Sequence, residues 1–123
     1  MSSRHATAER RGRLAETLCV VALNLTGWRV VARRLRSKRG TGLGEIDIIA
    51  RRGQTVAFIE VKARRDMAAA VESVTAAQRA RIARSAEVYL QQRPNLADCQ
   101  ARFDLMVLGG SLLPRRIVDA WRP

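Results

Sequence analysis

The sequence predicts an α/β fold in which helices flank one mixed β-sheet. Helical and extended segments follow each other in the order α-β-β-β-α-β-β. The run TVAFIEVKA, 55–63, is apolar over most of its length, as in a central strand that is covered on both faces. A helix between two strands makes a crossover, which adds a parallel pair to an antiparallel meander. A chain of 123 residues is expected to form a single domain, 1–123.

A long helix is predicted near the start of the chain, over 7–26. The apolar residues that recur there at helical spacing are Leu14, Leu18, Val21 and Leu25. Gly27 marks its end, because glycine commonly follows the last turn of a helix. Residues 1–6 precede the periodic segment, and we expect them to form a flexible basic arm.

Five strands are expected to make up the sheet. The segments with strand-like patterns are 28–36, 45–51, 55–63, 102–108 and 115–121. The last of them is a short addition to an α-β-β-β-α-β core. A glycine-rich turn, 37–44, joins the first two strands, and a turn at Gly109 and Gly110 joins the last two.

The second helix is expected over 75–92, with Pro94 just beyond its end. Thr75 and Gln78 have the spacing of a capping box, which would explain both residues by hydrogen bonds at the helix start. Contact of Gln78 with a substrate or a water molecule is the alternative. The segment 66–74 is expected to be a loop or an irregular turn.

The charge of the chain indicates a polyanionic partner. It has 23 basic and 11 acidic residues and a net charge of +12, and nucleic acid is the commonest partner of such a surface. A solvated basic face in an arginine-rich protein is the alternative. The longest apolar stretch, 18–25, is too short to span a bilayer, so we expect no membrane partner. Cys19 and Cys99 form no CxxC pair, which suggests reduced thiols in a cytoplasmic protein.

The chemistry open to the chain is narrow. His5 is its only histidine, which argues against a Ser-His-Asp triad, a Cys-His pair and a His-rich zinc site. No GxGxxG or GxxxxGK loop is present to cradle a nucleotide. Any catalysis must therefore rest on carboxylates and on Lys62.

Three charged residues lie inside expected strands: Asp47, Glu60 and Lys62. Alternation puts Glu60 and Lys62 on one face, about 6–7 Å apart, and a hairpin could bring Asp47 near Glu60. Burying unpaired ions is costly, so one interpretation is a structural ion pair of Lys62 with a carboxylate. The other is a Mg²⁺ site, because two close carboxylates supply hard oxygen ligands. A lysine on the same face could then orient or deprotonate a water molecule, as metal-assisted phosphodiester hydrolysis requires.

An Asp followed by Glu-x-Lys on adjacent strands resembles the core of restriction-endonuclease-like nucleases. More narrowly, the chain resembles the YraN family of bacterial proteins, which are predicted endonucleases. The matching pieces are GRLAE, ARRLR, GEIDIIA, FIEVKAR, RIARSAEVYL, RFDLMVL and DAW, in family order over 12–121. The resemblance implies a restriction-endonuclease-like fold and a Mg²⁺- or Mn²⁺-dependent endonuclease whose partner is nucleic acid, DNA rather than RNA. Many small nucleases of this type dimerise to cut two strands, so the resemblance also allows a homodimer.

The resemblance further implies residue roles. Asp47 and Glu60 would be metal ligands, with the Val61 carbonyl as a third, and Lys62 would act on the attacking water or on the transition-state charge. Glu16, on the first helix, matches a glutamate that can complete the metal site in related nucleases. A plain exposed helix glutamate fits its spacing equally well.

Several residues nearby in the chain are candidates for supporting roles. The basic residues expected to hold phosphates over the site are Arg33, Arg34, Arg36, Lys38, Arg39, Arg64 and Arg65. Glu45 is either a partner of the metal ligands or a solvated residue. Asp104 is expected to be structural, paired with Arg102 or another nearby arginine. The alternative to an enzyme is a non-catalytic nucleic-acid-binding or accessory module that retains the fold.

Overall fold

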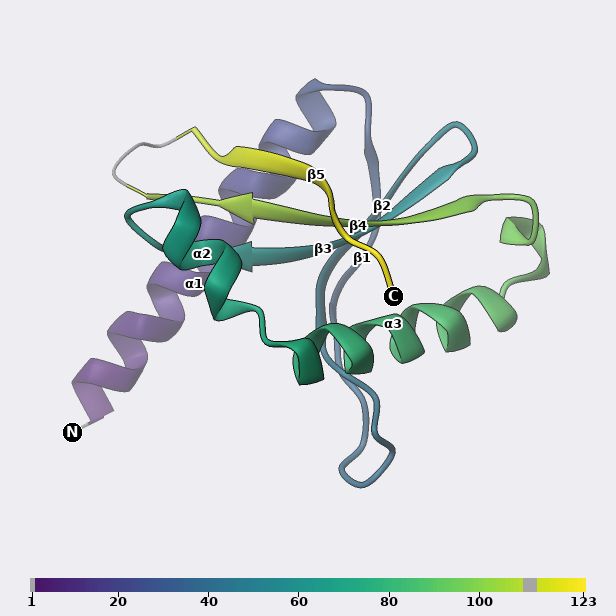
Figure 1. Cartoon of the computed structure of the whole chain (residues 1–123). Coiled ribbons are helices and arrows are strands. Elements are labelled where there is room, and N and C mark those ends of the chain that lie inside the picture. The colour runs from purple at the N-terminus through teal and green to yellow at the C-terminus, as the bar shows by residue number, and fades with distance from the viewer. Residues whose placement is uncertain (1, 110–112) are drawn as a thin grey trace.

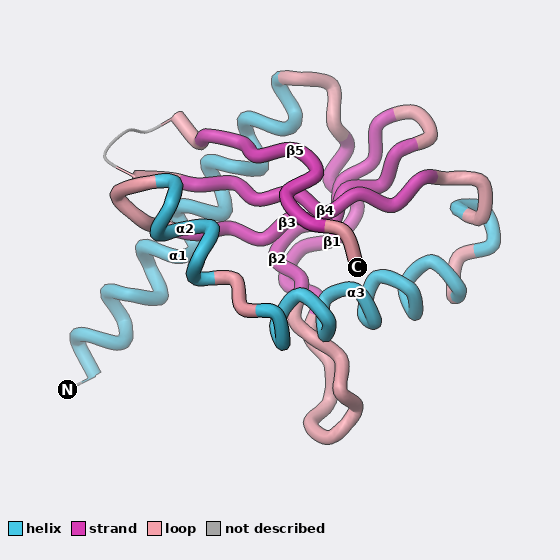
Figure 2. Tube along the Cα trace, in the orientation of Figure 1, coloured by secondary structure: helices cyan, strands magenta, loops and turns pink. Residues whose placement is uncertain are grey.

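The computed structural model describes the backbone of residues 2–109 and 113–123, and the side chains of 12–109 and 113–123. The elements in chain order are α1 (Ser2–Leu25), β1 (Arg29–Leu35), β2 (Ile46–Arg52), β3 (Thr55–Lys62), α2 (Met67–Ser73), α3 (Ala76–Gln91), the 3₁₀ turn η1 (Pro94–Leu96), β4 (Gln100–Val107) and β5 (Arg115–Trp121) (Figures 1 and 2). The predicted α/β class and the order of the strands are confirmed. The predicted turn at Gly109 and Gly110 lies partly outside the described residues.

The five strands form one mixed sheet in the order β1-β2-β3-β4-β5. The β1–β2, β2–β3 and β4–β5 pairs are antiparallel, and β3 pairs with β4 in parallel. The parallel pair follows from the crossover through α2 and α3, because a hairpin cannot join parallel strands. Strand β3 therefore lies at the centre of the sheet.

Helices cover both faces of this sheet, with α1 on one face and α2 and α3 on the other (Figure 1). On the α1 face, Cys19 and Leu23 pack with residues such as Ile48 and Ile59. Burial on both faces explains the apolar run 56–59 of β3, because side chains that point to either face of the sheet are shielded from water.

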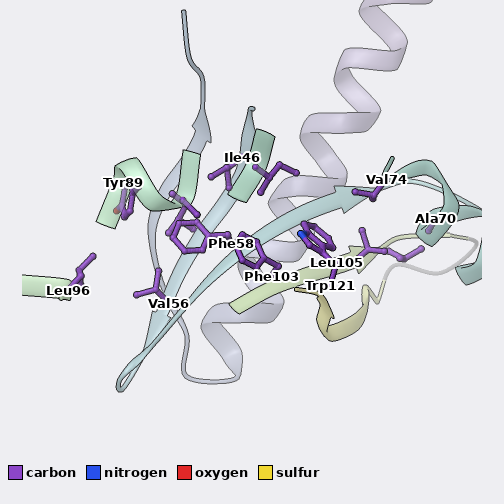
Figure 3. Packing of buried hydrophobic residues seen from close by; sticks show 14 residues of the cluster. Ile46, Val56, Phe58, Ala70, Val74, Tyr89, Leu96, Phe103, Leu105 and Trp121 are labelled. Atoms are coloured by element: carbon purple, nitrogen blue, oxygen red, sulfur yellow. The ribbon is translucent and has the colours of Figure 1, made fainter. Parts of the chain in front are cut away.

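An aromatic row crosses the other face of the sheet (Figure 3). Phe58 of β3 stacks against Phe103 of β4 with ring centroids 5.7 Å apart, and Phe103 stacks in turn on Trp121 of β5 at 5.7 Å. Tyr89 of α3 meets Phe58 edge to face at 6.0 Å. Such ring pairs contribute roughly 0.5–1.5 kcal/mol each beyond their buried area. The pair of Tyr89 with Phe58 holds α3 against the central strand, and the other two pairs join β3, β4 and β5.

Helix α1 differs from the prediction in its start and in its buried face. It begins at Ser2, so residues 2–6 of the segment expected to be a flexible arm have helical backbone; no glycine or proline there interrupts the helix. The buried positions are Ala15, Glu16, Cys19 and Leu23, whereas Leu14, Val21 and Leu25 of the periodic set are 57%, 49% and 82% exposed. The face of the helix that packs on the sheet is thus a different one from the face that the spacing predicted.

Helix α2 lies where a loop was expected, so that prediction was wrong. Asp66 caps the helix, because its side chain accepts a hydrogen bond from the Ala69 N–H at 2.7 Å. Ala70 is fully buried in the core cluster on this face of the sheet. A cap, an alanine-rich sequence and this packing together offset the short length of the helix.

Among the helices that the structure describes, none is long and apolar enough to cross a membrane.

Candidate active site

Asp47 and Glu60 face each other across the β2–β3 hairpin. The antiparallel register pairs Ile48 with Ile59, which places Asp47 opposite Glu60. Asp47 Oδ2 accepts a hydrogen bond from the Val61 N–H at 2.8 Å. Glu60 is only 8% exposed, and Asp47 is partly buried. The structure thus brings together the two carboxyl groups that the strand pattern predicted would meet.

The two carboxyl groups disfavour each other's ionised form. Burial is the largest cause that raises the pKa of each, and the charge of Asp47 and its hydrogen bond with Glu60 raise the pKa of Glu60 further, to about 8. The hydrogen bonds from Val61 and Glu60 oppose the upward shift in the pKa of Asp47. The two carboxyl groups therefore titrate as a coupled pair, in which ionisation of one opposes ionisation of the other.

Lys62 lies next to this pair, with its Nζ 3.6 Å from Glu60 Oε1. The two side chains share a face of β3, as alternation predicted. The charge of Lys62 lowers the pKa of Glu60 without cancelling the effect of burial. The ion pair offered above as the structural interpretation is present, and the same contact holds the amine beside both carboxyl groups.

A cavity of about 280 Å³ opens on the α3 side of the carboxylate pair, and we call it the α3-side cavity. Its lining residues are Leu43, Gly44, Glu45, Asp47, Glu60, Gln78 and Arg81. The Gln78 N–H donates to Thr75 Oγ1 at 3.1 Å, which confirms the capping role of Thr75. Contact of Gln78 with a substrate stays a prediction, as does the partner role of Glu45.

Gly44 brings the start of β2 against α3. Its N–H donates to the Arg81 carbonyl at 3.1 Å. A Cβ at position 44 would lie 3.0 Å from the backbone carbon of Arg81 and from its Cβ, closer than nearly all real contacts of this kind. The glycine therefore sets the width of the α3-side cavity beside Asp47.

Glu16 lies on the buried face of α1, at 6% exposure, so the exposed-glutamate interpretation is wrong. Its two carboxylate oxygens lie 2.9 Å from Arg33 Nε and 2.9 Å from Arg34 Nε. Consecutive strand residues normally point to opposite faces, but Arg34 has a left-handed φ of 52°, which allows both arginines to reach Glu16.

A second cavity, of about 290 Å³, lies on this side, and we call it the α1-side cavity. Glu16, Arg34, Arg36 and Asp47 are among its lining residues. Asp47 thus lines both the α1-side cavity and the α3-side cavity. Burial raises the pKa of the Cys19 thiol, and the charges of Asp47 and Glu16 raise it further, to about 12.

The carboxylate pair fits a hard divalent cation. Carboxylate oxygens are the ligands that Mg²⁺ and Mn²⁺ prefer, and a cation between Asp47 and Glu60 would relieve the repulsion that raises their pKa values. Within 12–109 and 113–123, no three His, Cys, Asp or Glu side chains are grouped to hold a metal ion. Glu16 does not complete a triad in this arrangement, because arginines occupy its oxygens. The pair suits an ion that retains several of its own water molecules.

The predicted phosphate-binding residues fall in three places. Arg36, Lys38 and Arg39 lie in the segment 36–45 between β1 and β2, here called the β1–β2 arm, which projects beyond the sheet (Figure 1). Residues 64–65 lie just beyond the end of β3 and are exposed. The remaining two, Arg33 and Arg34, form ion pairs with Glu16. Contact of these groups with nucleic acid stays a prediction.

Asp104 is structural, as predicted. It is fully buried, and Arg102 Nε and Nη2 donate to its two oxygens at 2.9 Å each. Arg116 Nη2 donates to it at 2.7 Å and the Asp119 N–H at 3.0 Å. Burial alone would raise the pKa of Asp104, but the hydrogen bonds from Arg102, Asp119 and Arg116 outweigh it and lower that pKa.

Sequence reasoning did not single out Arg81, which lines the α3-side cavity with the two carboxylates. The available signal was its spacing: Arg81 follows Gln78 by three residues, which places both on one face of α3.

The mixed sheet with helices on both faces, and the Asp, Glu and Lys side chains gathered on its central hairpin, define an α/β protein with a restriction-endonuclease-like core. The chain belongs to the family described as Uncharacterised protein family UPF0102, whose model matches residues 15–108. This confirms the resemblance to the YraN family, which is the same family.

Relatives of similar length support this membership. A UPF0102 protein of Paramagnetospirillum magneticum is 49% identical, over 98% of this chain and 94% of the relative. One from Parvibaculum lavamentivorans is 46% identical, over 94% and 84%. One from Rhizobium johnstonii is 41% identical, over 93% and 90%.

Proposed function

We propose that the protein is a metal-dependent endonuclease-like hydrolase that cleaves phosphodiester bonds in nucleic acid, in DNA rather than RNA. The observation that carries the proposal is the placement of Asp47 opposite Glu60, with Lys62 Nζ 3.6 Å from Glu60 Oε1. A buried carboxylate pair is costly to maintain for stability alone. Functional sites are where such raised carboxyl pKa values gather.

The proposed roles follow from the chemistry of each group. A Mg²⁺ or Mn²⁺ ion held by Asp47, Glu60 and the Val61 carbonyl would supply positive charge that stabilises the phosphate in the transition state. The amine of Lys62 orients the attacking water, or in its neutral form takes the proton that this water loses. The water oxygen bonds to phosphorus as the bond from phosphorus to the leaving oxygen breaks. The water loses its proton to Lys62 or to solvent, and the leaving oxygen takes a proton from solvent. Gln78 and Arg81, which line the α3-side cavity, are placed to donate hydrogen bonds to phosphate oxygens.

The basic residues supply the means to hold a strand over the site. The β1–β2 arm carries Arg36, Lys38 and Arg39, and Arg64 and Arg65 lie two and three residues after Lys62. Together they would fix the phosphodiester backbone without reading its sequence. The net charge of +12 would also speed the encounter with a polyanion.

The alternative is a nucleic-acid-binding or accessory module that retains the fold but does not cut. The observation that favours this alternative is that charged groups of the site form ion pairs with each other. Lys62 pairs with Glu60, and Glu16 pairs with Arg33 and Arg34. Charges that are satisfied internally would support the fold without catalysis.

A cleavage panel tests the proposal. Highly purified protein is incubated with duplex, branched and single-stranded DNA and RNA in the presence of Mg²⁺ or Mn²⁺. We expect cleavage that Asp47→Ala and Lys62→Ala abolish, while salt-dependent binding survives in both variants. Equal cleavage by Asp47→Ala would identify a contaminating nuclease. Binding with no cleavage of any substrate would favour the alternative.

Two further proposals concern location and assembly. Cys19 and Cys99 are free thiols, and Cys19 is fully buried, which supports a reducing cytoplasm as the place of action.

The exposed apolar residues Leu14, Val21 and Leu25 on α1 support association of two copies. Analytical ultracentrifugation of the wild type and Val21→Glu tests this, since a dimer built on α1 should dissociate in the variant.

A further inference from the structure

A third cavity lies between the β1–β2 arm and α3, and we call it the arm groove. Its volume is about 230 Å³. Its lining residues are Leu35, Arg36, Ser37, Lys38, Thr41, Leu43, Ser85, Val88, Tyr89, Gln92 and Arg93. It is smaller than the roughly 300–1,000 Å³ pockets that hold drug-sized ligands, so its natural occupant is a single small planar or compact group.

The walls of the arm groove are held by hydrogen bonds. Arg84 Nε and Nη2 both donate to the Gly42 carbonyl, at 3.0 Å and 2.8 Å. Ser85 Oγ, which is buried, donates to the Gly44 carbonyl at 2.6 Å. These bonds tie the arm to α3 at two points. The groove is therefore formed before any ligand arrives, which reduces the entropy lost on binding.

The chemistry of the lining suits a nucleotide. Leu35, Leu43, Val88 and Tyr89 give apolar contact surface, and three cations border it: Arg36, Lys38 and Arg93. An apolar slot edged by cations matches a base that carries a phosphate on one side. A purely apolar ligand would leave the cations without a partner in the complex.

Arg93 supplies a flat surface in this groove. Its Cζ lies 3.6 Å from the centroid of the Tyr89 ring, and its Nη1 donates to the Tyr89 carbonyl at 3.2 Å. One face of the guanidinium therefore rests on the ring, and the group is fixed in orientation. Proteins that bind single strands stack bases on guanidinium planes as well as on aromatic rings.

The arm groove adjoins the candidate active site. Leu43 lines both the groove and the α3-side cavity that contains Asp47 and Glu60. Arg36 lines both the groove and the α1-side cavity that Asp47 also borders. A strand that crosses the carboxylate pair can therefore place a neighbouring nucleotide in the groove, provided that the base of that nucleotide is not paired.

We propose that the arm groove binds one unpaired nucleotide of a DNA strand whose backbone passes over Asp47 and Glu60. The base stacks on the Arg93 guanidinium, and Arg36 and Lys38 hold the adjoining phosphate. The proposal deepens the nuclease function proposed above and rests on it for the path of the strand. It assigns the substrate class: DNA with an unpaired nucleotide beside the bond to be cut.

Binding without cleavage tests this proposal. Fluorescence anisotropy in EDTA compares a fully paired labelled DNA duplex with the same duplex carrying one bulged adenosine. We expect the bulged duplex to bind roughly tenfold more tightly, the gain expected from stacking one base. Equal affinity for the two duplexes would overturn the proposal.

Two variants test whether the preference for the bulged duplex arises in the arm groove. Arg93→Lys keeps the positive charge but removes the planar surface, and Val88→Trp fills the groove without changing any charge. Each should bring the bulged duplex to the affinity of the paired one and leave the paired duplex unchanged. Arg115→Lys, at an exposed position of β5, is the matched control and should keep the full preference. A preference that survives both groove variants would also overturn the proposal, with circular dichroism melts to verify folding.

Failure of this inference is distinguishable from failure of the nuclease function. Preferential binding of the bulged duplex with no cleavage in Mg²⁺ or Mn²⁺ supports the groove and overturns the nuclease function. Cleavage of both duplexes at one rate, with equal binding, supports the nuclease function and overturns the groove.

Discussion

The carboxylate of Asp47 on β2 accepts a hydrogen bond from the backbone N–H of Val61 on β3, at 2.8 Å. Val61 lies between Glu60 and Lys62 in the chain, so this bond fixes the Asp47 side chain relative to both. The strands that carry the three groups are also the central strands of the sheet. The charged cluster is thus held by rigid elements rather than by loops, as a preorganised site requires.

Asp47→Asn removes the charge but keeps an oxygen that can accept the hydrogen bond from Val61. We expect cleavage by the variant to fall at least about a hundredfold, because the lost charge acts on the transition state in a largely buried site. Binding of nucleic acid in EDTA should not weaken, since a negative charge near phosphate has been removed. Single-turnover cleavage and anisotropy measure the two effects. Asp98→Asn, at an exposed position, is the control, and wild-type cleavage by Asp47→Asn would refute the assigned role.

The carboxylates and Lys62 could be placed from sequence because their arrangement depends on local rules. Alternation along β3 puts Glu60 and Lys62 on one face, and the short turn to β2 brings Asp47 alongside. The unbroken apolar run of β3 also identified it as the central strand. These relationships need no knowledge of distant packing.

The features that could not be predicted depend on tertiary contacts. The spacing of Leu14, Val21 and Leu25 indicated a helix, yet the residues buried against the sheet belong to another face of it, and only the packing of α1 reveals them. The pairing of Glu16 with both arginines requires the left-handed backbone of Arg34, which no propensity favours. Helix α2 is short, and its packing against the core decides its conformation.

Glu16→Gln tests whether this glutamate is structural or completes a metal site. Because both oxygens contact arginines, we expect the variant to lose about 1 kcal/mol of unfolding free energy, a modest value since both arginines remain over one-third exposed. Cleavage should stay within about tenfold of the wild type, a smaller change than loss of a general catalytic group causes.

Chemical denaturation and cleavage assays on Glu16→Gln, with exposed Glu72→Gln as the control, give both quantities. Loss of cleavage as complete as that of Asp47→Asn, with unchanged stability, would instead make Glu16 a metal ligand.

Asp104→Asn should be among the most destabilising single changes in the protein. It leaves the guanidinium groups of Arg102 and Arg116 without their buried partner, and breaking such a pair costs about 3–5 kcal/mol. Asp119→Asn is the matched control, because its partner Arg122 is 84% exposed and asparagine tolerates the left-handed φ of 55° at this position. Denaturant titration at neutral pH should therefore separate the two variants clearly.

The contribution of Asp104 to stability should also depend on pH. Its pKa in the folded protein is lowered below the ordinary 3.8, so its carboxylate stabilises the fold above pH 3.8. As the pH falls through the lowered folded value, the folded state gains a proton and that stabilisation is lost. The difference in unfolding free energy between wild type and Asp104→Asn should shrink in acid. A constant difference from neutral to strongly acidic pH would contradict the lowered pKa.

Gly44→Ala should widen or distort the α3-side cavity. The new Cβ would lie 3.0 Å from Arg81 backbone and side-chain atoms and from the Ile82 nitrogen, so β2 or α3 must shift. We expect a loss of about 1–3 kcal/mol in unfolding free energy, the usual cost of overpacking, and a fall in cleavage, because Asp47 follows three residues later, at the start of β2. Gly12→Ala is the opposite control. Apart from its chain neighbours and the backbone of its own helix, no atom of the described residues lies within 4 Å of the new methyl group, and stability should rise by about 0.5–1 kcal/mol. If Gly44→Ala proved as stable and active as Gly12→Ala, the close approach of β2 to α3 would not set the geometry of the site.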